Sequence, residues 1–219
     1  MTEGRYAVAV DVVVFAVRDA ELQVLLIRRG IEPFCDRWAL PGGFVRARET
    51  VEEAAARELE EETRVKGLYL EQLQTFSAPD RDPRERVISV AHVALLPADR
   101  TKDAVEGGSD AREAAWHRVS TVLSRKSRRV ALAFDHEAIL GVALERLRAR
   151  TLSTAVAFRL LPREFTLSEA QRVHEIVLGH PVDKVTFRRR LAALALVRET
   201  PRMRHGPHRP ARLYVAADL

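Results

Sequence analysis

A cluster of acidic side chains stands out between residues 42 and 65. Glu58, Glu61 and Glu62 follow Arg57 in the segment R-E-L-E-E-E. Side chains three and four residues apart share one face of an α-helix, so we expect these three carboxylates to converge on one patch. Their mutual repulsion can be relieved by a hard divalent cation such as Mg²⁺, which favours carboxylate oxygens and keeps water and phosphate oxygens as its other ligands. A solvated acidic helix face is the alternative interpretation.

Two neighbouring features favour a built site over a solvated face. Arg57 can bridge to Glu53 or Glu61 and hold the array of carboxylates in place. Gly42 and Gly43 have no side chains, so the backbone there can approach the same spot closely. A chelated metal and the phosphates of a ligand could both be accommodated by such an arrangement.

The spacing of these residues resembles the Nudix box. That pattern is Gly, five residues, Glu, seven residues, Arg-Glu, an apolar residue, any residue, Glu-Glu, any residue, Gly and an apolar residue. The positions that match are Gly43, Glu49, Arg57, Glu58, Leu59, Glu61, Glu62 and Val65. In that family the carboxylates matching Glu58, Glu61 and Glu62 bind Mg²⁺ or Mn²⁺ for the attack of water on a diphosphate bond. The resemblance therefore implies that these three residues hold the metal and that, with Arg57, they are catalytic.

One position departs from the box, because Arg64 stands where the pattern has its last glycine. Glycine ends a helix easily since it accepts the left-handed conformation. Arginine in that conformation costs about 1 kcal/mol, or it forces a different turn. We therefore expect a metal site that is chemically complete but geometrically loosened, in which ligand binding is retained more readily than catalysis.

The loop that follows the box suggests the ligand. It contains Phe76, which can stack on a base, and Arg81, Asp82 and Arg84, of which the arginines can meet phosphates bidentately. Alone, this is equally compatible with a charged hairpin loop. However, the stretch Q-L-Q-T-F-S-A-P-D-R-D-P-R resembles the signature of Nudix proteins that act on or bind ADP-ribose, and the likeness covers most of residues 7–97. The predicted ligand-binding residues are Arg57, Phe76, Arg81, Asp82, Arg84, Gly42 and Gly43.

The positive charge of the chain is concentrated in its last third. Residues 151–219 carry 12 Lys and Arg against six Asp and Glu, a net charge of +6, whereas the whole chain has +5. Residues 1–150 are therefore close to neutral. A local basic surface suits nucleic acid better than a uniform one. A solubilising tail is the alternative, but the apolar periodicity within this segment favours a folded domain.

Two helices are predicted in this basic segment. Residues 165–179 form the first, with a capping box of Thr166 and Glu169 and a stop at Gly179. Asp183 caps the second, whose apolar positions we expect to face the core: Val185, Phe187, Leu191 and Leu194. A hairpin with a basic tip follows, so the layout is that of a winged helix-turn-helix. The predicted DNA-binding residues are Lys184, Thr186, Arg188, Arg189, Arg190, Arg204, His205 and Arg209. A helical docking domain with a charged surface is the alternative.

The remaining elements position these sites. Strands are expected at Val8–Ala16, Leu22–Ile27, Tyr69–Phe76, Val87–Leu96 and Glu113–Val119, and the acidic helix at Thr50–Thr63. The segment Trp38–Gly43 is predicted to be a short strand that enters a Gly-rich turn. A further helix, at about 134–150, should present Ile139, Leu140 and Leu147 on one face and join two domains, 1–150 and 151–219. The fold class is α+β: a Nudix α/β/α sandwich with a mixed sheet, then the winged helix-turn-helix. His117 is interpreted as a structural histidine.

The order of the two domains resembles the Nudix-related transcriptional regulators of NAD metabolism. That family implies a homodimer that binds operator DNA, a Nudix domain that senses ADP-ribose, and repression of NAD synthesis or salvage genes. An active ADP-ribose pyrophosphatase and a bifunctional protein are the alternatives. The single cysteine, Cys35, excludes an internal disulfide and favours the reducing cytoplasm. No signal peptide or membrane-spanning segment is expected.

Overall fold

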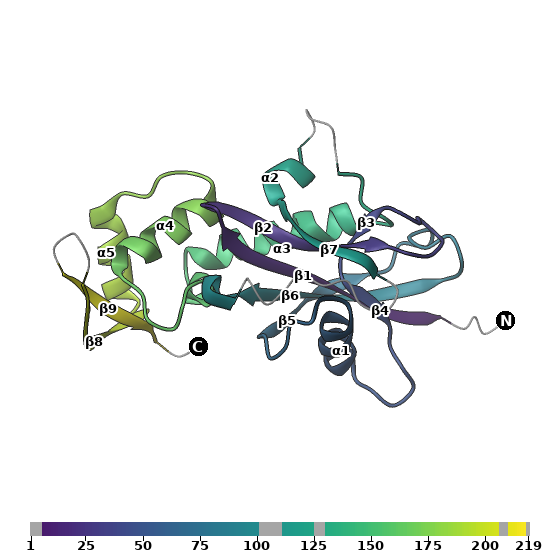
Figure 1. Cartoon of the computed structure of the whole chain (residues 1–219), viewed down its shortest axis with the longest axis horizontal. Coiled ribbons are helices and arrows are strands. Elements are labelled where there is room, and N and C mark those ends of the chain that lie inside the picture. Colours follow the sequence, from purple (N-terminus) through teal and green to yellow (C-terminus); the bar gives the residue numbers. More distant parts are fainter. Residues whose placement is uncertain (1–5, 101–110, 125–129, 206–209, 218–219) are drawn as a thin grey trace.

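The computed structural model describes residues 6–100, 111–124, 130–205 and 210–217, so the predicted DNA contact Arg209 lies outside the described residues. Figure 1 shows a large sheet with helices on its faces and, beside it, a smaller helical part that carries a two-stranded hairpin. This arrangement confirms the predicted fold class, an α/β/α sandwich followed by a winged helix-turn-helix. Among the helices of the described residues, none combines the length and apolarity needed to cross a bilayer.

The elements of the larger part are β1 (Ala7–Arg18), β2 (Glu21–Arg29), β3 (Trp38–Ala39), β4 (Gly42–Phe44), α1 (Val51–Thr63), β5 (Leu70–Phe76), β6 (Val87–Leu96), η1 (Ala98–Arg100), β7 (Ala111–Arg118) and α2 (Val119–Val122). The chain continues through α3 (His136–Thr151), η2 (Val156–Leu160), α4 (Leu167–Leu178), α5 (Lys184–Ala193), β8 (Val197–Arg204) and β9 (Ala211–Ala216). In the segment Trp38–Gly43 the predicted short strand is confirmed as β3, but Gly42 and Gly43 begin a second strand, β4, where a turn was predicted. Proline has no N–H for a strand ladder, and Pro41 interrupts the pairing.

Strand β1 is the centre of the mixed sheet. It pairs in parallel with β6 and antiparallel with β2 and β4. Within the described residues the sheet has seven strands, in the order β3-β2-β1-β6-β5, with β4 beside β1 and β7 beside β2. Successive side chains of a strand face opposite sides. Val12 and Val14 therefore join the core beneath α1, whereas Val13 and Phe15 join the core beneath α3, which explains the unbroken apolar run of this strand.

Helix α1 begins with the predicted capping box. The Glu53 backbone N–H donates to Thr50 Oγ1 at 3.2 Å, and the Thr50 N–H donates to Glu53 Oε2 at 2.8 Å. Ala54, Ala55 and Leu59 are buried against the sheet. The capping hydrogen bonds occupy the carboxylate of Glu53. The ion pair predicted between Arg57 and Glu53 is therefore wrong.

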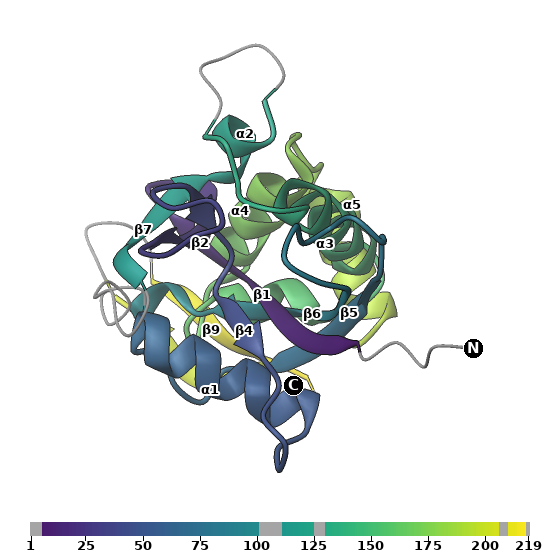
Figure 2. The ribbon, with the colours of Figure 1, turned by 90° about the vertical axis from the view of Figure 1, so that its right-hand side faces the viewer.

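Helix α3 covers the opposite face of the sheet and also reaches the C-terminal part (Figure 2). Its predicted apolar face is confirmed, since Ile139, Leu140 and Leu147 are buried. One buried cluster extends from Phe15 in β1 through α3 to Phe187 in α5. The sheet, α3 and the C-terminal helices therefore share a continuous hydrophobic core.

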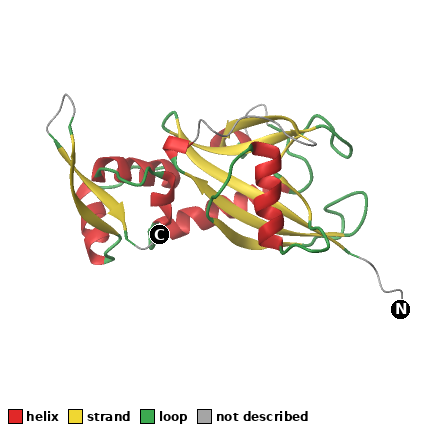
Figure 3. Ribbon diagram, turned by 60° about the horizontal axis from the view of Figure 1, so that its bottom comes forward, coloured by secondary structure: helices red, strands yellow, loops and turns green. Residues whose placement is uncertain are grey.

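The C-terminal part has the predicted winged layout, with α4 and α5 packed together and β8 and β9 as the wing (Figure 3). Two core assignments in α5 are wrong: Val185 is 72% exposed and Leu194 is 46% exposed. The buried face of α5 is set by Phe187 and Leu191. Val185 lies two residues from Phe187, which on a helix is the opposite face, and Leu194 comes after the last helical residue.

Candidate functional site

The guanidinium of Arg57 is the centre of the acidic cluster. Its Nε and Nη2 donate to the two carboxylate oxygens of Glu49, at 2.9 and 2.7 Å. Its Nη1 donates to Glu58 at 2.7 Å and to Glu61 at 3.3 Å. The hydrogen bonds from Arg57 lower the pKa of Glu49 to about 2, and Glu49 in turn raises the pKa of Arg57. Arg57 thus contacts three of the clustered carboxylates and offsets part of their negative charge.

The two glycines leave room for the carboxylates, as predicted. A side chain at Gly43 would place its Cβ 2.3 Å from Glu58 Oε1, closer than any real contact. At Gly42 a Cβ would lie 2.1 Å from the Val10 carbonyl oxygen. The Gly42 N–H donates to Glu62 Oε2 at 2.9 Å, and Glu62 is buried. The backbone between β3 and α1 therefore binds one carboxylate directly and packs against another.

The helix ends at Arg64 in the left-handed conformation that the glycine of the box would adopt. Arg64 has φ 62° and ψ 7°, and its N–H donates to the Glu60 carbonyl at 2.9 Å. The turn has therefore been kept and the arginine bears the strain. The left-handed turn at Arg64 therefore leaves all three carboxylates on α1, and the predicted loosening of the metal site stays a prediction.

The carboxylate oxygens are the right chemical type for Mg²⁺ or Mn²⁺. However, in the part of the chain that the structure describes, no group of three Asp, Glu, His or Cys side chains is arranged to hold a metal ion. Arg57 contacts Glu58 and Glu61, and Glu62 is turned toward the Gly42 N–H. A divalent cation would have to displace Arg57 from two of these carboxylates.

A pocket opens next to the glycines, between β1, β4, the loop after β5 and the start of α3. It is lined by Gly42, Gly43, Arg81, Asp82 and Arg84 of the predicted ligand-binding residues. Its volume is about 60 Å³, so in this conformation it holds only part of a nucleotide. The remainder of such a ligand would lie over the exposed residues at its edge.

Arg84 is the basic group best placed for an anionic ligand. Asp82 accepts from Arg84 Nε at 3.0 Å and from Nη2 at 2.7 Å, so the guanidinium has a fixed orientation. The guanidinium carbon lies 5.4 Å from the ring centroid of Phe44 and 5.9 Å from that of Phe134. Asp82 therefore acts by orienting Arg84, because its own side chain is buried.

Arg81 is held in a buried ion-pair network. Its Nη2 lies 2.7 Å from Asp135 Oδ1 and 3.1 Å from Asp11 Oδ2, and its side chain is 4% exposed. His136 Nε2 lies 3.1 Å from the other oxygen of Asp11. Although burial opposes ionisation, His136 and Arg81 outweigh it and hold the pKa of Asp11 well below its usual range. Arg81 thus connects the loop to the start of α3, a role that the sequence prediction of direct ligand contact did not include.

The predicted aromatic residue is not at the pocket. Phe76 lies at the end of β5 and packs against the core beneath α3. Phe44 and Phe134 line the pocket instead, and both were missed. The position of Phe44, directly after the two glycines, could have revealed it. Phe134 becomes a neighbour only through the tertiary structure. His117, interpreted as structural, packs edge-on against Trp38 with ring centroids 4.3 Å apart.

The basic residues of α5 form the candidate DNA-binding surface. Lys184, Arg188 and Arg189 are exposed, whereas Thr186 is half-buried and donates its backbone N–H to the cap Asp183 at 2.8 Å. The turn before the helix is fixed by Glu175, which accepts from the Val182 N–H at 3.1 Å. Three exposed cations thus project from the first two turns of a helix that is firmly held at its start.

Two of the predicted DNA-binding arginines are less available. Arg190 is half-buried because it lies three residues after Phe187, toward the inner face of α5. Its Nη1 is buried and has no hydrogen-bond partner among the residues that the structure describes. Arg204 pairs with Glu169 and donates to the Glu164 carbonyl at 3.3 Å, so it ties the wing to α4. His205, at the end of β8, is exposed.

Comparison with known families and proteins agrees with this division of the chain. The NUDIX domain model matches residues 5–135, and the model of the NrtR DNA-binding winged helix domain matches residues 157–216. Helix α3 lies between the two matched ranges. The chain is 36% identical over 207 residues to the ADPR responsive transcriptional repressor NtrR of Acinetobacter baylyi, which covers 94% of this chain and 80% of that protein.

Two solved structures are also similar. Shewanella oneidensis NrtR complexed with a 27mer DNA is 36% identical, with a TM-score of 0.83, and the match covers 96% of this chain and 93% of that chain. The NUDIX domain of the same protein, complexed with ADP ribose, is 33% identical, with a TM-score of 0.59, and the match covers 65% of this chain and 89% of that chain.

Proposed function

We propose that this chain is a transcriptional repressor that binds operator DNA and responds to ADP-ribose. The chain belongs to the Nudix family and carries a winged helix domain of the NrtR type. The A. baylyi relative is named an ADPR responsive repressor, and the S. oneidensis relative has been solved with DNA and, as its NUDIX domain, with ADP ribose. These relatives support the proposal, as do the exposed cations of α5 and the pocket beside the two glycines.

The observation that carries the proposal is the position of α3. The helix begins at the ligand pocket, where Phe134 and His136 are lining residues. Asp135, its N-cap residue, is bound by Arg81 from the loop that also presents Arg84. In the second half of α3, Arg148 Nε donates to the Val177 carbonyl of α4 at 3.0 Å. A single helix therefore contacts the candidate ligand site at one end and the helix-turn-helix at the other.

This geometry gives ADP-ribose a route to the DNA-binding helices. A ligand that contacts Arg84 would act through the same loop on Arg81 and Asp135, and hence on the orientation of α3. In a homodimer, a small rotation of α3 would change the spacing of two α5 helices, and half-sites one helical turn apart would no longer fit. Coupling of usual size, about 1–3 kcal/mol, corresponds to a change of about 5- to 150-fold in affinity.

The test is a calorimetric titration of ADP-ribose into the full chain with and without saturating operator DNA. Linkage requires each ligand to weaken the binding of the other by the same factor. The titrations are run without a divalent metal, so that no metal-dependent turnover contributes heat. We expect a 5- to 150-fold weaker affinity with operator present. Equal affinities would rule out the sensor function.

A matched pair of loop variants tests the route through α3. Asp135→Asn removes one ion pair of Arg81, and we expect it to reduce the coupling factor while ADP-ribose still binds. Asp80→Asn makes the same chemical change at an exposed position of the same loop, and should leave the coupling unchanged. Equal coupling in both variants would place the communication elsewhere.

The metal and the regulated genes belong to the same proposal. Nudix hydrolases generally use divalent metal ions. We propose that Glu58, Glu61 and Glu62 hold Mg²⁺ or Mn²⁺ when Arg57 moves away from them. Regulation of NAD synthesis or salvage genes, a homodimeric state and a cytoplasmic location are further parts of the proposal. Incubation with ADP-ribose and Mg²⁺, followed by detection of AMP and ribose 5-phosphate, decides whether the protein also hydrolyses its ligand.

A further inference from the structure

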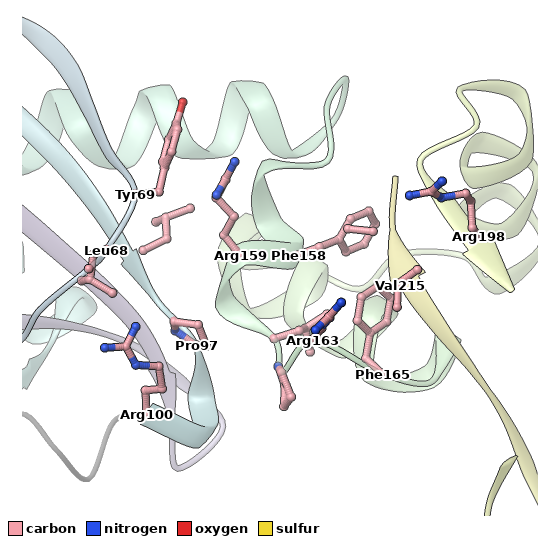
Figure 4. A pocket seen from close by; sticks show the side chains of 15 residues that line it. Leu68, Tyr69, Pro97, Arg100, Phe158, Arg159, Arg163, Phe165, Arg198 and Val215 are labelled. Atoms are coloured by element: carbon pink, nitrogen blue, oxygen red, sulfur yellow. The ribbon is translucent and has the colours of Figure 1, made fainter. Parts of the chain in front are cut away.

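A second, larger cavity lies between the Nudix domain and the winged helix, on the side of the molecule where β5 begins and where β6 and β9 end. Its volume is about 510 Å³, within the range of about 300–1,000 Å³ that is usual for small-molecule sites. Leu68, Tyr69 and Pro97 come from the Nudix domain, and Val215 and Ala216 come from the wing. The segment from η2 to α4 forms the floor (Figure 4).

Four arginines from four separate segments line this cavity. They are Arg100 in η1, Arg159 in η2, Arg163 in the segment before α4, and Arg198 in β8. Figure 4 shows Arg100 and Arg198 on opposite sides, with Arg159 and Arg163 between them. Among the described residues that line the cavity, none is acidic.

Ion pairing differs between these arginines and their neighbours. Within the described part of the chain, no carboxylate pairs with Arg159, Arg163 or Arg198, whereas Arg202 and Arg204 of the same wing pair with glutamates. Arg100 Nη2 donates to a backbone carbonyl, that of Lys66, at 2.7 Å. Several guanidinium groups gathered in one concave space without counter-charges create a strongly positive potential, which an anion would relieve.

The walls between the arginines are suited to a ring. Tyr69 is 40% exposed, and the guanidinium carbon of Arg159 lies 3.8 Å from its ring centroid. Phe158, Leu161 and Phe165 supply buried apolar surface at the floor. Guanidinium groups bind phosphate bidentately, and an aromatic side chain can stack on a planar ring. An apolar, aromatic surface with a few convergent polar or charged groups is the usual composition of a small-molecule site.

We propose that this cavity binds a small phosphorylated metabolite of nucleotide type, separately from the Nudix pocket. The cavity contains none of the residues that line the pocket of Gly42, Gly43 and Arg84. Its lining also includes none of the exposed cations of α5. Because its walls come from both domains, an anion bound there would join Arg100 to Arg198 across the interface and hold the wing against the Nudix domain.

The test uses AMP and inorganic pyrophosphate as probes, titrated calorimetrically into the full chain in EDTA. Pyrophosphate reports the anion subsite alone, and AMP adds a ring. We expect saturable binding by the wild type. Arg159→Gln/Arg163→Gln should weaken it by about 100-fold, since each charged hydrogen bond contributes about tenfold. The control Arg18→Gln/Arg118→Gln removes the same charge from residues outside the cavity and should change nothing.

Arg198→Gln gives an independent readout from the opposite wall. This residue is exposed, so its substitution should leave the fold intact, and the probes should bind about tenfold more weakly. The proposal is overturned if neither probe binds the wild type at millimolar concentration. It is also overturned if the cavity variants bind the probes as the wild type does, or if they lose affinity only for operator DNA, which would make these arginines contacts of the DNA backbone.

Discussion

Replacement of Arg64 by glycine should stabilise the protein, and the expected size follows from the end of α1. Arg64 has φ 62°, a conformation that costs an L-residue about 1–2 kcal/mol. Glycine removes that strain, but it also adds freedom to the unfolded chain, which costs about 0.4–1 kcal/mol. The side chain of Arg64 is exposed, so little packing is lost. The expected net gain is about 0.5–1 kcal/mol in the free energy of unfolding.

Thermal unfolding followed by circular dichroism can resolve this difference. For a chain of 150–250 residues, 1 kcal/mol shifts Tm by about 2–4 °C, so Arg64→Gly should raise Tm by about 1–4 °C. The matched control is Arg48→Gly, the same change at an exposed residue that does not have a positive φ. At position 48 glycine relieves no backbone strain and only adds freedom to the unfolded chain, so Tm should fall slightly.

The comparison of the two variants decides the matter. If Arg64→Gly lowers Tm as much as Arg48→Gly does, the left-handed arginine carries no net strain and the argument from its backbone conformation is refuted. If Tm rises while affinity for ADP-ribose is unchanged, the substitution in the Nudix box affects stability alone. A gain in affinity would instead connect the helix end to the ligand site.

Three further predictions concern charge. Arg188→Glu/Arg189→Glu should abolish the gel shift of an operator fragment, because it replaces two phosphate-binding cations with anions. Tm should be unchanged, since both side chains are exposed. A persistent gel shift would mean that α5 is not the recognition helix. Glu62→Gln should weaken metal-dependent ADP-ribose binding with little loss of Tm, and a large loss in metal-free buffer would make Glu62 structural. Burial lowers the pKa of His174 to about 4, so the unfolded chain binds the proton more tightly than the folded chain does. The free energy of unfolding should therefore fall by up to about 3 kcal/mol as the pH is lowered from about 6.5 to about 4. Urea unfolding across that range should show a smaller loss for His174→Phe, and an equal loss would exclude His174 as the cause.

The sequence alone determined the local elements of both sites. Fixed spacing placed Glu58, Glu61 and Glu62 on one helix, and capping boxes at Thr50 and Thr166 marked the starts of α1 and α4, both of which are confirmed. These features depend on residues a few positions apart, so the chain order specifies them without knowledge of the fold. The winged layout followed for the same reason, from apolar periodicity and turn residues.

Only the tertiary structure decided which partners those residues have. Arg57 bonds Glu49 and Glu58 and not Glu53, because the cap had already used the carboxylate of Glu53. Arg81 is buried between Asp11 and Asp135, which are 70 and 54 residues away, so its guanidinium is occupied by two carboxylates. Contacts over such distances in the chain depend on how the sheet and α3 pack, and no local pattern encodes them. The same packing gathers four arginines of four segments around one cavity, where each alone is an ordinary surface residue.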